Sequence, residues 1–207
     1  MPNFRYEQDI LSANPTAVIA GVDEAGRGPW AGPVMAGAAI LNPQTLPDDL
    51  RHGLDDSKKL TPERREQLFE RLSTCNAVVL GVGQADVAEI DQLNILRATY
   101  LAMTRAVAAL GRNVDVALVD GNRAPPLACT VRTIVKGDAQ SLSIAAASIA
   151  AKVTRDRLML SLAQVHPGYG WETNMGYGTA AHQSGLSKFG ITPHHRRSFA
   201  PIRALMP

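Results

Sequence analysis

Short apolar runs alternate with longer amphipathic stretches along the chain, and this alternation predicts an ordered series of strands and helices. Five runs rich in β-branched residues predict strands at about 17–23, 33–41, 76–84, 116–120 and 130–135. Apolar residues at helical spacing predict helices at about 61–72, 91–110 and 139–164. This order of strands and helices is typical of an α/β domain with a mixed sheet.

The helix predicted at 91–110 carries one continuous apolar stripe. The stripe consists of Leu96, Tyr100, Met103, Val107 and Leu110. We assign it to the hydrophobic core and not to a binding groove.

The flanks of the predicted domain differ from its centre in composition. Residues 1–16 predict an irregular lead-in, and residues 17–165 hold all the predicted strands and long helices. Residues 166–207 are rich in Gly, Pro and basic side chains. We expect them to form a small extension of loops and short helices that packs on the main domain.

Composition and charge narrow the class of protein. Of the 207 residues, 45% are hydrophobic and 19% are charged, which argues against disorder. No apolar run approaches the ~18 residues of a membrane helix, and the N-terminus lacks the apolar segment of a signal peptide. These features predict a cytoplasmic protein without a membrane partner.

Charge is unevenly distributed along the chain. From residue 151 onward there are seven basic residues and only two acidic ones. One interpretation is a basic surface that binds a polyanion, and the other is scattered solvated charge.

Two adjacent acids mark the end of the first predicted strand. Asp23 and Glu24 close an otherwise apolar run, and Gly26-Arg27-Gly28 follows them. On a regular strand neighbouring side chains point to opposite faces, so both acids reach one site only if the chain bends there. A polar strand end before a turn is the alternative interpretation.

Two further acids lie at the ends of other core elements. Asp120 precedes a glycine as in many hairpin turns, and Asp138 precedes a helix as a cap would, so each has a structural explanation. Together with Asp23 and Glu24 they fit a pair of Mg²⁺ or Mn²⁺ ions, which prefer oxygen ligands. Two such ions ~3.5–4 Å apart promote phosphodiester hydrolysis.

Other residues have the chemistry to bind a nucleic acid. The Gly26–Gly28 loop has one residue too many for a dinucleotide fingerprint, but its backbone can approach a sugar hydroxyl or a phosphate closely. Tyr177 lies in a glycine-flanked loop, where an aromatic ring can stack on a base or sugar. The candidate hydroxyl and cationic contacts are Lys58, Ser148, Lys152 and Arg196. Taken alone, Lys58 is better explained as solvated, Ser148 and Lys152 fit an exposed helix stripe equally well, and Arg196 fits either a phosphate contact or a simple surface.

Seven segments in order resemble the motif series of bacterial ribonuclease HII. They are Gly-Val-Asp-Glu-Ala-Gly-Arg-Gly-Pro (21–29), Asp-Ser-Lys-Lys-Leu (56–60), Val-Asp-Gly-Asn (119–122), Lys-Gly-Asp (136–138), Ala-Ala-Ser-Ile-Ala-Ala-Lys-Val-Thr-Arg-Asp (146–156), Gly-Tyr-Gly-Thr (176–179) and His-Arg-Arg-Ser-Phe (195–199). The resemblance covers about residues 15–203. It implies a ribonuclease H-like fold with a mixed central sheet flanked by helices, and an endonuclease that cuts RNA paired to DNA.

The resemblance also implies residue roles. It implies cutting on the 5′ side of a ribonucleotide embedded in DNA, leaving 3′-hydroxyl and 5′-phosphate ends. Asp23, Glu24 and Asp120 match the metal-binding acids, and Asp138 matches the fourth acid. The Gly26–Gly28 loop matches the segment that reads the 2′-hydroxyl, and Tyr177 matches the tyrosine that packs on the following deoxyribose.

Two positions depart from the family pattern, and two other functions compete with it. Met175 stands where a Lys is usual, which removes one phosphate contact, and Asp55 stands where Asn is common.

Another nuclease or nucleotidyl transferase would share the acids but not need the ribose-reading loop. A non-catalytic hybrid-binding module would leave the four acids without a purpose. We expect a monomer; a sliding clamp as partner is not readable from the sequence.

Overall fold

A five-stranded sheet in the order β3-β2-β1-β4-β5 organises the chain in the computed structural model, which describes residues 1–206. β1 (Ile19–Ala25) and β2 (Val34–Leu41) pair antiparallel, and so do β2 and β3 (Val78–Ala85). β4 (Val116–Asp120) lies parallel to β1, and β5 (Thr130–Ile134) lies parallel to β4. The mixed sheet predicted from the sequence is confirmed.

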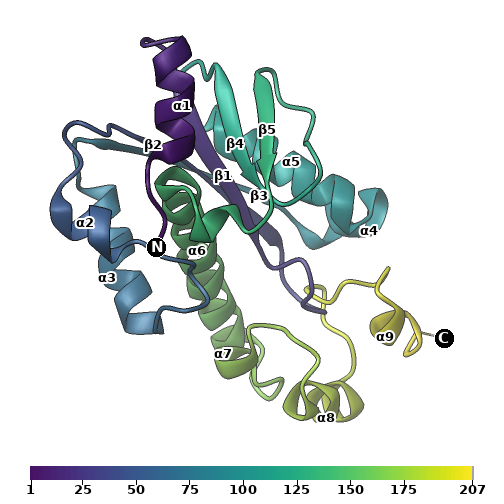
Figure 1. Ribbon diagram of the computed structural model, residues 1–207. Helices are drawn as coiled ribbons and strands as arrows, with labels where there is room; N and C mark the ends of the chain where they lie inside the picture. Colours follow the sequence, from purple (N-terminus) through teal and green to yellow (C-terminus); the bar gives the residue numbers. More distant parts are fainter. Residues whose placement is uncertain (207) are drawn as a thin grey trace.

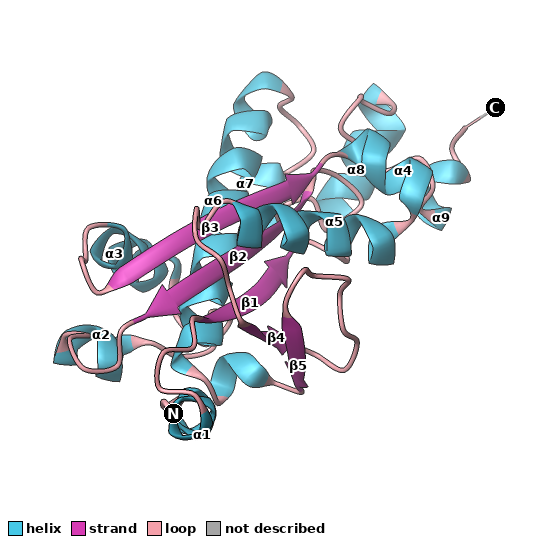
Figure 2. Cartoon of the chain, turned by 90° about the horizontal axis from the view of Figure 1, so that it is seen from above, coloured by secondary structure: helices cyan, strands magenta, loops and turns pink. Residues whose placement is uncertain are grey.

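Helices cover both faces of this sheet (Figures 1 and 2). In chain order they are α1 (Arg5–Ala13), α2 (Asp48–Gly53), α3 (Pro62–Ser73), α4 (Val87–Leu93), α5 (Ile95–Ala108), the 3₁₀ turn η1 (Gly137–Ala139), α6 (Leu142–Val165), α7 (Trp171–Asn174), α8 (Ala180–Phe189) and α9 (Ala200–Arg203). The long helix α6 packs on β1 and β2 from one side, and α5 packs on β2 and β3 from the other. Among the helices of residues 1–206, none is long and apolar enough to cross a membrane.

Two glycines let α6 lie directly against the sheet. Gly21 of β1 faces the backbone of Ser143, and Gly37 of β2 faces the carbonyl oxygen of Ala147. A methyl group at either glycine would overlap these backbone atoms. Because Gly37 pairs with Asp23 across the two strands, this close contact occurs beside the first of the predicted acids.

Two predictions of local structure are wrong. The predicted single helix at 91–110 is two helices, because Asn94 adopts a left-handed φ of 68° and caps α5 with its side chain. The predicted irregular lead-in contains α1 instead. Glu7 of that helix accepts hydrogen bonds from the Ser141 hydroxyl (2.7 Å) and the Ser143 amide (3.1 Å), so α1 holds the start of α6.

The C-terminal segment forms a hydrophobic cluster with the end of α6 and the loop after β1. Its buried members are Ala31, Met159, Ala163, Tyr169, Trp171, Leu186 and Ile202. In Figure 1, α8 and α9 lie beyond the end of the sheet, on the side where β1 ends. The segment therefore packs next to the Gly26–Gly28 loop, far from it in sequence.

Candidate active site

Three of the predicted acids meet at one edge of the sheet. The β1–β4 register pairs Val22 with Val119, so Asp23 and Asp120 are the next residues on two neighbouring parallel strands. Asp138 follows β5 in η1, and the Gly137 amide beside it donates a hydrogen bond to Asp120 Oδ1 at 2.6 Å. The carboxyl ends of parallel strands are where α/β sheets commonly place their sites.

The acids are crowded enough to disturb one another's ionisation. Burial raises the pKa of Asp23 well above its usual value, the neighbouring Glu24 and Asp120 carboxylates raise it further, and a Ser148 hydrogen bond opposes them. Burial raises the pKa of Glu24 against the opposing charge of Arg27. Burial and then the nearby Asp56 and Asp120 carboxylates raise the pKa of Asp138 to about 6. A site of this kind favours a bound cation.

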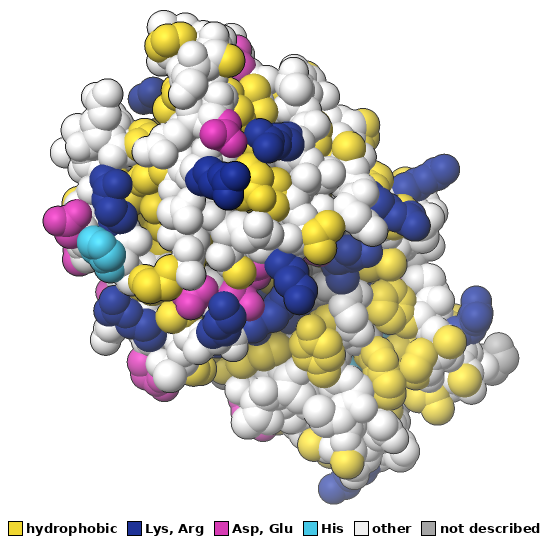
Figure 3. Space-filling view, in the orientation of Figure 1, with side chains coloured by type: hydrophobic (Ala, Val, Ile, Leu, Met, Phe, Trp, Pro, Cys, Tyr) yellow, Lys and Arg dark blue, Asp and Glu magenta, His cyan; other side chains and the backbone are white. Residues whose placement is uncertain are grey.

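Lys58 supplies positive charge to the same place. Burial alone would lower the pKa of Lys58, but the Asp23 and Asp138 carboxylates, with Asp56 and Asp120, outweigh it and raise that pKa. The Asp56 carboxylate lies near Asp138 and adds to the negative charge there. Figure 3 shows acidic side chains gathered near the middle of one face with Lys and Arg side chains around them. Acidic and basic side chains thus lie next to one another on this surface.

The donor set fits hard divalent cations. Asp23, Glu24, Asp120 and Asp138 offer only carboxylate oxygens, the ligands that Mg²⁺ and Mn²⁺ prefer. Within residues 1–206 no three acidic, His or Cys side chains already enclose a common point as a metal cage. The four acids thus share one region without forming such a cage.

A buried arginine shapes the Gly26–Gly28 loop from behind. Arg196 is 0% exposed, and its guanidinium donates to the carbonyls of Gly26 (2.5 Å), Arg27 (2.9 Å), Gly32 (2.9 Å) and Pro33 (3.2 Å). Burial lowers the pKa of Arg196 to about 9, with the positive charge of Arg155 adding to the effect. The loop conformation, including φ of 92° at Gly26, is thus fixed from the C-terminal segment.

A second buried arginine connects this loop region to the segment of Tyr177. Arg155 of α6 donates to the carbonyls of Ala31 (3.1 Å), Pro33 (3.1 Å) and Met175 (3.0 Å). Burial lowers the pKa of Arg155 to about 10. The Gly26–Gly28 loop and the half-exposed Tyr177 ring are neighbours, because a Cβ atom at Gly28 would lie 3.3 Å from Tyr177 Cε1.

The sequence of the chain is similar to those of known proteins. The family model of ribonuclease HII matches residues 20–202. The ribonuclease HII of Paramagnetospirillum magneticum is 54% identical over 100% of this chain and 99% of its own length. The chain belongs to the ribonuclease HII family.

Solved structures agree with this assignment. The ribonuclease H2 of Pyrococcus horikoshii superposes with a TM-score of 0.74 at 31% identity, over 90% of this chain and 96% of that one. The PCNA:RNase HII complex of Archaeoglobus fulgidus gives a TM-score of 0.72 at 26% identity, over 86% and 93%. The ribonuclease H-like fold is therefore confirmed. The enzyme is a divalent-metal-dependent endonuclease that cleaves the RNA of RNA–DNA hybrids.

Three residues predicted to contact substrate, Arg196, Ser148 and Lys152, are bonded to other groups of the protein in the structure. The structure corrects the phosphate contact predicted for Arg196, because its buried guanidinium binds backbone carbonyls. Ser148 is also buried; its hydroxyl lies 2.8 Å from the Ser57 hydroxyl, and it lowers the pKa of the neighbouring Asp23. It therefore orients an acid instead of facing substrate.

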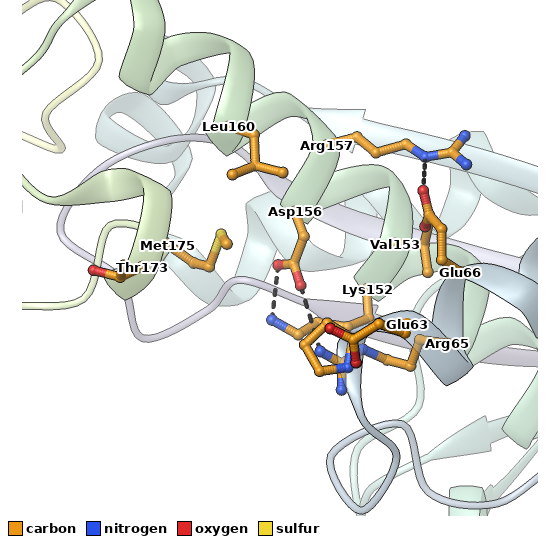
Figure 4. A pocket seen from close by; sticks show the side chains of 11 residues that line it. Glu63, Arg65, Glu66, Lys152, Val153, Asp156, Arg157, Leu160, Thr173 and Met175 are labelled. Atoms are coloured by element: carbon orange, nitrogen blue, oxygen red, sulfur yellow. Dashed lines mark hydrogen bonds and ion pairs between the residues drawn. The ribbon is translucent and has the colours of Figure 1, made fainter.

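Lys152, the third of these predicted substrate contacts, forms an ion pair within the protein. Its Nζ lies 2.7 Å from Asp156 Oδ1, and Arg65 approaches the other oxygen of that carboxylate at 3.9 Å (Figure 4). Lys152 also lines the hollow that holds Tyr177 and Lys58. A phosphate contact from Lys152 stays a prediction, and it would compete with this ion pair.

Sequence reasoning missed several residues that build the site. Asp56 and Ser57 stand in a quoted motif, but the pattern drew attention only to the lysines after them. Arg155 was one of several polar residues on a helix face, which gave no sign that it is 1% exposed. His195 opens the quoted motif at 195–199, but neither it nor His182 has a metal-site spacing, and nothing in the sequence showed that the two rings meet.

These two histidines form a buried hydrogen-bonded chain that ends at Tyr177. The Thr192 amide donates to His195 Nδ1 (2.9 Å), so His195 carries its proton on Nε2 and donates it to His182 Nε2 (3.0 Å). Trp171 Nε1 also donates to His182 Nε2 (3.2 Å), which leaves His182 Nδ1–H to donate to the Tyr177 carbonyl (3.0 Å). Both rings are neutral in this arrangement.

Acid should destabilise the enzyme through His195. Burial lowers the pKa of His195 from 6.5 to about 4, with His182 adding to the effect. Between those values the unfolded chain binds the proton and the folded chain does not, so folding stability falls as pH drops from about 6.5 towards about 4. Urea unfolding at several pH values should show this loss, and His195→Gln should lessen the slope. An equal slope in both proteins would contradict the assignment.

Proposed function

We propose that the enzyme nicks duplex DNA on the 5′ side of an embedded ribonucleotide and leaves 3′-hydroxyl and 5′-phosphate ends. One observation supports this most directly: a single hollow of about 240 Å³ joins the ribose-reading candidates to Glu24, one of the four acids. It is lined by Glu24, Ala25, Gly26, Arg27, Gly28, Ser57, Lys58, Lys152, Arg155 and Tyr177. A sugar lying there would contact the Gly26–Gly28 loop and sit within reach of the acidic edge.

The loop and the ring divide the recognition of two successive sugars. The backbone of Gly26–Gly28 contacts the 2′-hydroxyl of the ribonucleotide, because a glycine backbone admits a ligand closely. Tyr177 packs its exposed ring on the next sugar, a deoxyribose, where a 2′-hydroxyl would be crowded. The enzyme thus demands ribose on one side and rejects it on the other.

Two Mn²⁺ or Mg²⁺ ions would be held by Asp23, Glu24, Asp120 and Asp138. Bound there, such ions activate a water and stabilise the departing oxygen. Ser148 and the Gly137 amide orient Asp23 and Asp120, and Lys58 contacts a substrate phosphate. Binding that depends on such contacts weakens as salt rises.

The test is a labelled duplex containing one ribonucleotide, assayed with Mg²⁺ and with Mn²⁺ beside an all-DNA duplex. Product mapping should show one cut, 5′ to the ribonucleotide, and the all-DNA duplex should stay intact. Equal cutting of the all-DNA duplex would favour a general nuclease. Binding without turnover in either ion would favour a non-catalytic module.

Tyr177→Ala should slow this cut by about tenfold, because the junction is no longer held in line with the acids. Tyr177→Phe is the matched control and should keep most activity, since packing on a sugar uses the ring face. Single-turnover rates on the one-ribonucleotide duplex measure both variants. Equal rates for the Ala variant and the wild type would count against the packing role.

We also propose that the enzyme works as a cytoplasmic monomer. Light scattering of the purified protein tests the monomer. A sliding clamp is a candidate partner, since the Archaeoglobus fulgidus relative is known in a complex with PCNA.

A further inference from the structure

A second hollow adjoins the acidic edge and has no role in the function described so far. Its volume is about 430 Å³, within the usual range of ligand sites. It shares only Glu24 and Arg27 with the hollow of Tyr177, so these two side chains form the wall between them. Asp120 also borders the second hollow.

The lining of this hollow has an apolar floor and a cationic rim. Leu96, Tyr100 and Met103 of α5 contribute apolar surface, and the Thr99 hydroxyl is turned back to the Ile95 carbonyl at 2.7 Å. Asn122 and Arg123, just after β4, contribute an exposed polar edge. The apolar stripe assigned to the core from sequence therefore has one end that is only half-buried and faces this hollow.

Arg123 is available to an outside anion. Among the ion pairs and side-chain hydrogen bonds of residues 1–206, none involves Arg123, whereas Arg27 pairs with Glu24 at 3.3 Å. An apolar floor suits the carbon face of a sugar, and a guanidinium at the rim suits a phosphate oxygen.

We propose that this second hollow binds the deoxynucleotide immediately 5′ of the bond that is cut. The inference rests on the proposed function, which places the ribonucleotide at Gly26–Gly28 and its 3′ neighbour at Tyr177. The strand must then pass the acids in the 5′ direction, and the hollow beyond Glu24 is where it arrives. The sugar lies on Leu96 and Tyr100, and Arg123 contacts the phosphate on the 5′ side of that nucleotide.

A substrate with one neutral phosphate tests this contact. In a one-ribonucleotide duplex, a methylphosphonate replaces the phosphate one step 5′ of the scissile one. For the wild type we expect KM to rise about fivefold with kcat little changed, the effect of losing one exposed charge contact. Arg123→Gln should raise KM on the unmodified duplex by a similar factor, and the methylphosphonate should then add nothing.

The control variant is Arg112→Gln, which changes an equally exposed arginine on the connection before β4, outside both hollows. It should behave as the wild type on both substrates. Equal methylphosphonate effects in the wild type and in Arg123→Gln, or no effect in the wild type, would overturn the proposal. Failure of the proposed function is distinguishable, because it would show as a wrong or missing cut on the unmodified duplex.

Discussion

Asp120→Asn should reduce the cleavage rate by about a thousandfold or more while leaving substrate binding close to normal. The change removes one negative charge from the acidic edge but keeps the shape of the side chain. An amide oxygen at this position can still accept the hydrogen bond that the Gly137 amide now donates at 2.6 Å. The fold should therefore persist, and the lost charge should act on divalent-ion binding and chemistry.

Single-turnover rates on a labelled hybrid measure the first effect, and fluorescence anisotropy of the same duplex measures the second. Asp48→Asn is a suitable control, because Asp48 is an exposed acid at the start of α2 and far along the chain from the site. Its rate should match the wild type. A fully active Asp120→Asn enzyme would remove Asp120 from the catalytic group.

Gly37→Ala should lower the free energy of unfolding by about 3 kcal/mol. The added methyl group would meet the carbonyl oxygen of Ala147 in α6. Neither side can yield easily, because Gly37 lies on a strand paired on both edges and Ala147 lies inside a long helix. Urea unfolding followed by circular dichroism measures the change.

Gly53→Ala is the matched control for that experiment. A methyl group at Gly53 would meet first the end of the flexible Arg64 side chain, at 2.9 Å, which can move aside. Its stability should stay within about 1 kcal/mol of the wild type, since alanine also favours a helix. Equal stability of the two variants would show that α6 can shift away from the sheet without cost.

The sheet could be predicted, and the candidate acids could be singled out, because their signals are local. Each strand is a short apolar run, and Asp23, Glu24 and Asp120 stand where such a run ends. The two errors of local structure also have local causes: α1 is short and weakly apolar, and Asn94 stops a helix within an otherwise continuous periodic pattern.

The supporting residues could not be predicted, because their roles depend on which distant segments meet. Arg196 reads as a surface cation in a basic run, yet it lies against carbonyls about 170 residues away in sequence. Ser148 reads as one polar position in an alanine-rich helix, and only the fold places it between Asp23 and Ser57. A family resemblance identifies such residues, but it does not show that they support the site residues through protein contacts and do not bind substrate themselves.

The guanidinium of Arg196 has a consequence for the order in which the enzyme gains its properties. During synthesis the ribosome releases Asp23, Glu24, Asp120 and Asp138 well before Arg196 emerges. The sheet edge that carries the four candidate acids can therefore form while residues 26–33 still lack the four carbonyl contacts of Arg196, two of them within the Gly26–Gly28 loop. If the loop reads ribose as proposed, selectivity is the last property acquired, and loss of the Arg196 contacts would impair discrimination before it impaired cutting.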